Sequence, residues 1–223
     1  VPQVIQRGGQ VRLAAPPSLH AILREANLCP VVALETDDAA AEFHAPLMSL
    51  PYLCGTTLST VPNQVPYLHA NEHLSQQWRQ RLADLDGYQV GIGWQGNPAY
   101  AADRTRSIQL EHFQAVAKVP GVNLISLQKG PGVEQLDELV GRFTVHRLPA
   151  DFDTDNGAFM DTAAVMKQLD LVITSDSAIA HLAGALAVPV WVALPIVPDW
   201  RWLLAGEDCP WYPTMRLFRQ TRA

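Results

Sequence analysis

The sequence predicts an α/β protein with a doubly wound parallel sheet. After residue 87, short runs rich in Val, Ile and Leu alternate with segments of about ten residues that have helical periodicity. The runs are apolar almost throughout, as expected of parallel strands that are covered on both faces. The length of 223 residues exceeds the roughly 100–200 residues of a usual domain, so two modest lobes fit it as well as one large domain.

The part before residue 87 contains fewer strand–helix units, so the first lobe is predicted to be incomplete. Residues 10–15 and 31–35 have the alternating or apolar character of strands. Residues 16–27 predict a helix with Ser18 as its candidate N-cap. Residues 70–85 predict a longer helix with one apolar stripe.

Strands and helices alternate more regularly in the rest of the chain. The expected strands are 88–95, 122–130, 144–149, 171–177, 188–195 and 215–223. The expected helices are 109–119, 132–143, 159–170 and 177–187. This alternation implies parallel pairing through right-handed crossovers, with a lobe boundary near residues 84–88.

Charge and hydropathy exclude several classes of protein. The net charge is −6 and no run of Lys or Arg occurs, so a nucleic-acid partner or an anionic membrane surface is not expected. The apolar runs are shorter than the ~20 residues of a membrane span, and no signal-peptide pattern opens the chain. Cys29, Cys54 and Cys209 are far apart and lack metal-ligand spacing. We interpret them as buried or incidental thiols of a cytoplasmic protein.

Gly91, Gly93 and Gly96 form a literal G-x-G-x-x-G after a predicted strand. A dinucleotide-binding fingerprint needs a helix that starts at the second or third glycine. Here Asn97 and Pro98 favour a turn, and helical periodicity starts only near residue 109. We therefore assign Gly91 and Gly93 to the strand, where glycine permits close approach of a neighbour or ligand. A nicotinamide or flavin site is the less favoured alternative.

The loop after this strand carries Arg104, Arg106 and Ser107. It lies where open α/β sheets bind ligands, beyond the carboxyl end of a strand. Guanidinium groups suit phosphate oxygens, so the loop is a candidate phosphate site. The alternative is a solvated loop whose arginines pair with surface acids.

A second candidate site follows the strand at 171–174. Asp176 or Ser177 can cap the next helix, whose first N–H groups and positive dipole end suit a diphosphate. His181 lies one turn after Ser177, on the same helix face, and can donate to a phosphate oxygen. The alternative is a capped core helix with a satisfied histidine.

Four further residues have weaker functional interpretations. Asp161, with Thr162 beside it, is an ordinary N-cap candidate, and the alternative is a contact to a sugar or ribose hydroxyl. Lys129 is a lone lysine after a strand. Trp200 belongs to a Trp-rich segment for which lobe packing is favoured over stacking on a base or sugar.

Several segments together carry a resemblance to a known family. SDSAIAHLAGALAVPVWVALP (residues 175–195) resembles the donor-binding segment of family-nine glycosyltransferases, the lipopolysaccharide heptosyltransferase type. With GWQGNPAYAADRTRSI, SLQKG and PDWRWLLAGEDCPWYPTMRLFRQ, it resembles the glycosyltransferase-like domain found behind tetratricopeptide repeats in many bacterial proteins. The resemblance extends from about residue 44 to residue 220.

This resemblance implies a GT-B-like fold of two Rossmann-type doubly wound lobes, the N-terminal one incomplete. Residues 1–86 would be a partial acceptor-side lobe, residues 87–208 the nucleotide-sugar-binding lobe, and residues 209–223 a segment that returns toward the first lobe. Gly96 and Asn97 would line the cleft between the lobes.

The resemblance also implies roles for site residues. Asp176, Ser177 and His181 match a D-[ST]-x-x-x-H motif that contacts the phosphates and sugar of the donor. Arg106 falls near the place of a phosphate-contacting lysine. The implied reaction is metal-independent, inverting transfer from a nucleotide-diphosphate sugar to an unknown glycan, lipid or protein acceptor. No cofactor is expected, and no Asp-x-Asp metal cluster is present in the sequence.

The sequence departs from the family at both ends. In the family, a glycine-rich loop of the N-terminal lobe carries the base that deprotonates the acceptor, and a helix closes the chain. This sequence starts after that loop and stops before that helix, so it resembles a truncated copy without an identified base. Two rivals to an active transferase follow: a non-catalytic nucleotide-sugar-binding or scaffold module, and a sugar-nucleotide epimerase of the same fold.

Overall fold

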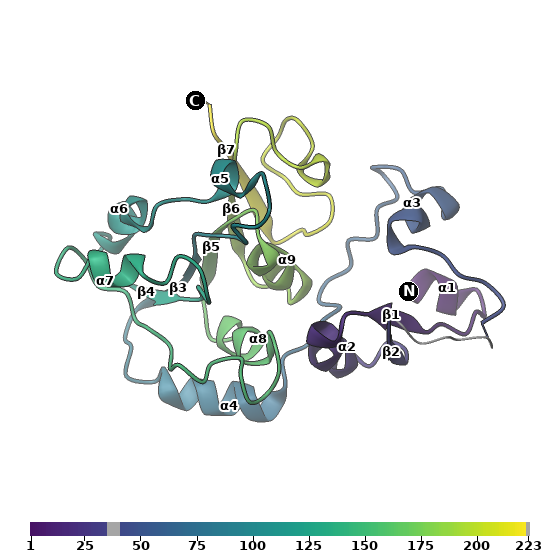
Figure 1. Cartoon of the computed structure of the whole chain (residues 1–223), viewed down its shortest axis with the longest axis horizontal. Helices are drawn as coiled ribbons and strands as arrows, with labels where there is room; N and C mark the ends of the chain where they lie inside the picture. The colour runs from purple at the N-terminus through teal and green to yellow at the C-terminus, as the bar shows by residue number, and fades with distance from the viewer. Residues whose placement is uncertain (35–40, 222–223) are drawn as a thin grey trace.

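The computed structural model of the chain describes residues 1–34 and 41–221, which form two bodies (Figure 1). The small body contains α1 (Pro2–Gln6), β1 (Leu13–Ala15), η1 (Pro17–Leu19), α2 (His20–Glu25), β2 (Val31–Ala33), η2 (Leu47–Ser49) and α3 (Leu50–Leu53). Its strands β1 and β2 pair in parallel, with Leu13 opposite Val31. Among the described residues, these two short strands are the sheet of the small body, and the predicted incompleteness of the first lobe stays a prediction.

The large body follows along the chain. Its helices are α4 (Glu72–Arg81), α5 (Asp103–Arg106), η3 (Leu110–Phe113), α6 (Gln114–Ala117), α7 (Gln135–Glu138), α8 (Met160–Met166), α9 (Ala178–Ala185) and η4 (Trp200–Trp202). Its strands are β3 (Tyr88–Gly93), β4 (Val122–Ser126), β5 (Leu171–Ser175), β6 (Val190–Leu194) and β7 (Met215–Arg219). All five strands are parallel, as predicted, and their order is β4-β3-β5-β6-β7.

This strand order contains a reversal. The chain passes from β3 to β4 on one side, returns to β5 on the other side of β3, and continues outward to β6 and β7. In doubly wound sheets such a reversal is a topological switch point, and ligands bind there beyond the carboxyl ends of the strands. The switch point of this sheet lies between β3 and β5.

Both faces of the large sheet are covered, as its apolar strands predict. Val172 belongs to a core that includes residues of α8 and α9, whereas its neighbour Leu171 belongs to a second core with η3 and α7. Helix α4 packs on α8 (Figure 1), where the indole Nε1 of Trp78 donates to Asp161 Oδ1 over 2.8 Å. Residues 72–81 therefore lie against the large body, although the sequence assigns them to the first lobe. The division into 1–86, 87–208 and 209–223 stays a prediction.

Gly91 and Gly93 lie within β3, which confirms their predicted place in a strand. A Cβ on Gly91 would overlap the side chains of Leu169 and Leu127. A Cβ on Gly93 would lie 3.1 Å from Thr174 Oγ1, which is tight packing. These glycines admit neighbouring protein groups at the sheet, and no helix starts at Gly96.

Several expected elements are shorter than predicted. The helix expected at 132–143 is reduced to α7, and the strand at 144–149 to one bridge between His146 and Ile125. The helix at 109–119 begins as 3-10 turn η3 before α6. Ser18 lies inside η1 and caps nothing, because α2 begins at His20. Residue 35 of the expected strand 31–35, and residues 222–223 of the last, lie outside the described residues.

Within residues 1–34 and 41–221, no helix is both long and apolar enough to cross a membrane.

Candidate functional site

The predicted phosphate-site residues meet at the switch point of the large sheet. Gly96, Arg106 and Ser107 come from the segment after β3, while Asp176 and Ser177 come from the segment after β5. Because β3 and β5 are adjacent and parallel, their carboxyl ends share one edge. Both segments were predicted from the sequence as phosphate sites, and the strand order brings them together.

A buried carboxylate that the sequence analysis missed organises the first segment. Asp103 is 4% exposed; its Oδ1 accepts from Arg106 Nε at 3.1 Å and its Oδ2 accepts from Ser107 Oγ at 3.0 Å. The main-chain N–H of Gly96 donates to Ser107 Oγ over 3.2 Å. A Cβ on Gly96 would overlap both the Asp103 carboxylate and the Arg106 guanidinium. Glycine at this position therefore lets the loop close over the ion pair.

Arg106 joins the two segments. Its Nη1 donates to the main-chain oxygen of Asp176 over 2.8 Å. The guanidinium carbon also lies 4.9 Å from the centroid of the Tyr100 ring. Among the described residues, the bonds to Asp103 and Asp176 occupy two of the five N–H donors of a guanidinium. The direction of the guanidinium is therefore fixed from two sides, and its other N–H groups are candidate donors to a ligand.

Helix α9 begins beside this arginine without a side-chain cap. Ser177 is its N-cap residue by position, but makes no capping hydrogen bond. Its Oγ lies 3.2 Å from Thr174 Oγ1 instead. The prediction that Asp176 or Ser177 caps the helix is therefore wrong. The Ser177 side chain leaves the start of the helix uncapped, and Ala180 N–H donates to Ser177 O over 3.1 Å. The N–H groups before Ala180 and the positive end of the helix dipole favour an anion.

His181 lies one turn into α9 and packs among aromatic rings. It stacks on Trp202 at 5.0 Å between ring centroids, and its Nδ1 lies 3.2 Å from the hydroxyl of Tyr212. Burial lowers the pKa of His181, more than the nearby Asp176 raises it. A neutral ring protonated on Nε2 accepts from Tyr212 at Nδ1 and keeps one N–H to donate.

The hydrogen bonds continue from His181 toward the small body. The Tyr212 hydroxyl lies 3.3 Å from that of Tyr67, and burial raises the pKa of both phenols. The main-chain N–H groups of Tyr67 and Leu68 donate to Ala185 O, at the last turn of α9, over 3.0 and 3.2 Å. The segment that leads from the small body is thus tied to both the middle and the end of α9.

A glutamine holds the first residues after β3 to the end of β4. Gln128 Oε1 accepts from the main-chain N–H groups of Trp94 and Gln95, both at 3.0 Å. Its Nε2 donates to Gln95 O and Pro131 O over 2.9 and 2.8 Å. The start of the segment that leads to Gly96 is therefore fixed on both sides.

Three of the weaker candidates make internal structural contacts. Asp161 is no N-cap, because α8 has Phe159 at that position. Its buried carboxylate accepts from Trp78 Nε1, from Asp153 N–H at 3.1 Å and from the Asn156 amide.

Thr162 donates to the Asp153 carboxylate through both its N–H and its hydroxyl. Lys129 Nζ donates to Phe152 O over 2.5 Å.

The other weaker candidates lie at the surface. Arg104 and Asn97 are exposed, and Asn97 Oδ1 accepts from Ala99 N–H within a turn. Trp200 is 56% exposed, meets Trp211 edge-on at 6.2 Å and lies under the Arg201 guanidinium. Contact between any of these residues and a nucleotide sugar stays a prediction. No group of three or more His, Cys, Asp or Glu side chains in the described ranges is arranged to hold a metal ion.

Comparison with known proteins identifies the fold. No protein-family model matches the chain. A family 9 glycosyltransferase from Veillonella parvula aligns with a TM-score of 0.54 and 16% identity, over 88% of this chain and 54% of its own. The E. coli heptosyltransferase WaaC in complex with ADP gives a TM-score of 0.47 and 14% identity, over 90% of this chain and 64% of its own. The chain therefore has the α/β, GT-B-type fold of the Veillonella protein.

One curated sequence is also similar. Protein FlbA of Caulobacter vibrioides is 29% identical over 171 residues, which is 73% of this chain and 27% of FlbA. The chain thus spans about a quarter of FlbA and about half of the Veillonella glycosyltransferase.

Asp103 and Tyr212 are the site residues that sequence reasoning missed. Asp103 stands three residues before Arg106 and four before Ser107, a spacing that places side chains on one face of a helical turn. This spacing could have identified Asp103 from the sequence. No such local spacing points to Tyr212, because it is 31 residues from its partner His181.

Proposed function

We propose that the chain is the nucleotide-sugar-binding part of a glycosyltransferase, with the donor diphosphate at the β3–β5 switch point. The observation that carries the proposal is the Arg106 guanidinium, held between Asp103 and Asp176 O beside the uncapped start of α9. A fixed cation and free helix N–H groups together are the usual protein partners of a phosphate. The fold shared with a family 9 glycosyltransferase supports the same reading.

Each residue of the site has a proposed contact that follows from its position. Arg106 and the first N–H groups of α9 meet the phosphate oxygens, and Ser107 holds the Arg106 loop. Asp176 and Ser177 line the turn between them, and His181 donates its Nε2 proton toward the donor. We propose that these groups stabilise the leaving diphosphate without a metal.

The proposed reaction is an inverting transfer. The acceptor oxygen forms a bond to the anomeric carbon as the bond from that carbon to the diphosphate oxygen breaks. The nucleoside diphosphate leaves with the electron pair, and a base takes the acceptor proton. No residue of this chain is proposed as that base.

A second candidate is a binding module that holds the donor without turnover. It is favoured by the ion pair of Arg106 with Asp103, which already balances the charge of the arginine within the loop. The diphosphate of the nucleotide sugar would then meet an arginine whose charge is already balanced, beside the further carboxylate of Asp176, which suits recognition but gives less stabilisation to a leaving group.

Incubation with ADP-, GDP- and UDP-linked sugars separates these functions. Equilibrium dialysis measures binding, and NMR of the anomeric proton follows the sugar. Transfer to water or to an added alcohol with inversion supports the transferase. Binding of one donor that stays intact supports the binding module. Absence of binding, or epimer formation without an acceptor, contradicts the proposal.

A further inference from the structure

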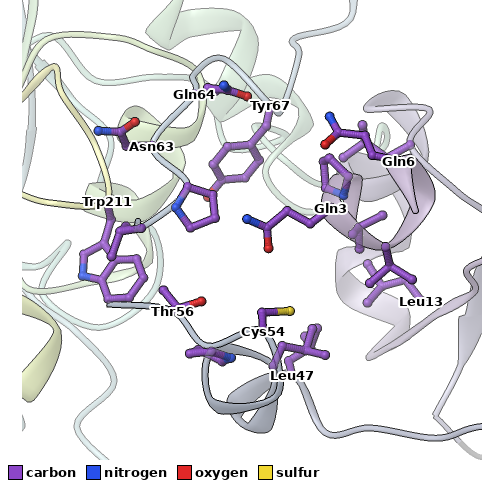
Figure 2. Close-up of a pocket in the computed structure, with 18 of the residues that line it drawn as sticks. Gln3, Gln6, Leu13, Leu47, Cys54, Thr56, Asn63, Gln64, Tyr67 and Trp211 are labelled. Atoms are coloured by element: carbon purple, nitrogen blue, oxygen red, sulfur yellow. The ribbon is translucent and has the colours of Figure 1, made fainter. Parts of the chain in front are cut away.

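A cavity of about 810 Å³ lies away from the switch point, between the small body and the segment that leads to α4. Figure 2 shows its walls, with Leu13 and Leu47 from the small body, Asn63 and Tyr67 from the connecting segment, and Trp211 from the large body. The volume lies within the roughly 300–1,000 Å³ of small-molecule sites. Its position between two bodies is also typical of such sites.

The walls are mainly aliphatic. The aliphatic lining residues include Leu13, Leu23, Val31, Leu47, Leu50 and Leu68. Two aromatic residues, Tyr67 and Trp211, complete this apolar surface. The apolar part of a ligand would be removed from water here, which favours binding.

The polar groups of the cavity are amides, hydroxyls and thiols. Side chains of this kind are Gln3, Gln6, Cys29, Cys54, Thr56, Ser59, Thr60, Asn63 and Gln64. Figure 2 shows the Gln3 amide toward the middle of the cavity, with the amides of Asn63, Gln64 and Gln6 at its margin. Among the described residues, the lining includes no Asp, Glu, Lys, Arg or His side chain. Within the part of the chain that the structure describes, the α-amino group of Val1 is the one charged group that lines the cavity. A ligand whose charge does not reach that group loses its hydration here without a counter-charge, which is costly.

The cavity wall is connected to the proposed donor site. Tyr67 lines the cavity and reaches His181 through the Tyr212 hydroxyl. Trp211 lines it as well, and its Nε1 donates to Arg201 O over 2.8 Å. Contacts of this kind hold the cavity at a fixed place relative to α9.

We propose that this cavity binds an uncharged amphipathic acceptor, a neutral glycoside with an apolar aglycone. The aliphatic walls take the aglycone, Tyr67 and Trp211 flank the sugar, and the amides of Asn63 and Gln64 meet its hydroxyls. The role as acceptor rests on the proposed function, whereas binding of such a compound does not.

The test uses octyl β-glucoside as the probe, below its micelle concentration, without nucleotide. Octyl sulfate has the same chain with an anionic head and serves as the matched compound. Alkylation by N-ethylmaleimide, followed by peptide mass spectrometry, reports occupancy, because Cys29 and Cys54 line the cavity while Cys209 is buried elsewhere. We expect octyl glucoside to slow alkylation of Cys29 and Cys54 about tenfold, and octyl sulfate to change it less than about twofold, given the cost of burying a charge.

A pair of variants locates the binding. Thr56 lines the cavity, whereas Leu58 in the same loop is 65% exposed and is absent from its lining. T56W should abolish octyl glucoside binding by filling the space, and L58W should leave it unchanged. If T56W fails to fold, the alkylation result on the unmodified chain still decides.

Each outcome has one meaning. No protection, equal protection by both amphiphiles, or equal binding by T56W and L58W overturns the inference. If the unmodified chain binds octyl glucoside but no nucleoside diphosphate, the proposed function alone is overturned.

Discussion

The Arg106 guanidinium donates to the main-chain oxygen of Asp176 over 2.8 Å, across a separation of 70 residues in the sequence. This bond ties the segment after β3 to the segment after β5 at the point where the strand order reverses. Asp103 orients the guanidinium from the other side at 3.1 Å. A cation fixed in this way loses little freedom when an anion binds, so its remaining donors are organised in advance.

The glycine that closes over this pair provides a first prediction. In G96A, the added methyl group would overlap the Asp103 carboxylate and the Arg106 guanidinium. We expect the free energy of unfolding to fall by about 1–3 kcal/mol, the usual cost of overpacking, and nucleotide binding to weaken with it. Urea denaturation measures the first effect. The exposed A99V in the same loop should change stability by less than about 0.5 kcal/mol; equal effects would contradict the assigned role of Gly96.

Attachment of α4 to α8 is tested by the Trp78–Asp161 pair. W78F keeps an aromatic ring against Phe152 but removes the donor to the buried carboxylate. We expect a loss of about 1–3 kcal/mol of unfolding free energy, because a buried acceptor loses its partner. In a double-mutant cycle with D161A, which removes the acceptor, the two losses should be less than additive. Strict additivity would show that the hydrogen bond contributes nothing.

Protonation of His181 should couple stability to pH. Burial places its folded-state pKa below its ordinary value of about 6.5, so the unfolded chain binds the proton more readily. The contribution is fully present above pH ~6.5, falls as the pH drops below that value, and levels off below the folded-state pKa. Thermal or urea unfolding from pH 8 to pH 5 measures it. H181Q should remove this component of the pH dependence, and an unchanged profile would contradict the buried neutral histidine.

The large sheet could be predicted because its central strands, such as Leu171–Ser175 and Val190–Leu194, are mostly apolar, which is characteristic of parallel strands covered on both faces. The weaker elements could not. Residues 132–143 have helical spacing, but glycines at both ends and little burial reduce the helix to Gln135–Glu138. Caps were predicted from residue type alone, and at Ser18, Asp161 and Ser177 the side chain finds another partner or none.

The candidate site was predictable only in parts. Parallel strands guarantee that segments after them share an edge, which brought Arg106 and Asp176 together. The partner of each group depends on tertiary contacts over 70 to 145 residues, such as Arg106 with Asp176 or Tyr67 with Tyr212. No local pattern encodes such pairs. The cavity of the small body likewise depends on Trp211, which comes from the far end of the chain.

The central claim is that a nucleoside diphosphate binds at Arg106. The most direct test is calorimetric titration of the chain with ADP, GDP and UDP, repeated on R106A and on the matched control R104A, which removes an exposed arginine two residues away. Circular dichroism first checks that both variants are folded. We predict that one nucleotide binds, that R106A weakens it by about 1.5–3 kcal/mol through loss of charged hydrogen bonds, and that R104A changes it by less than about 0.5 kcal/mol. Equal effects of the two substitutions, or no binding by the folded protein, would contradict the account.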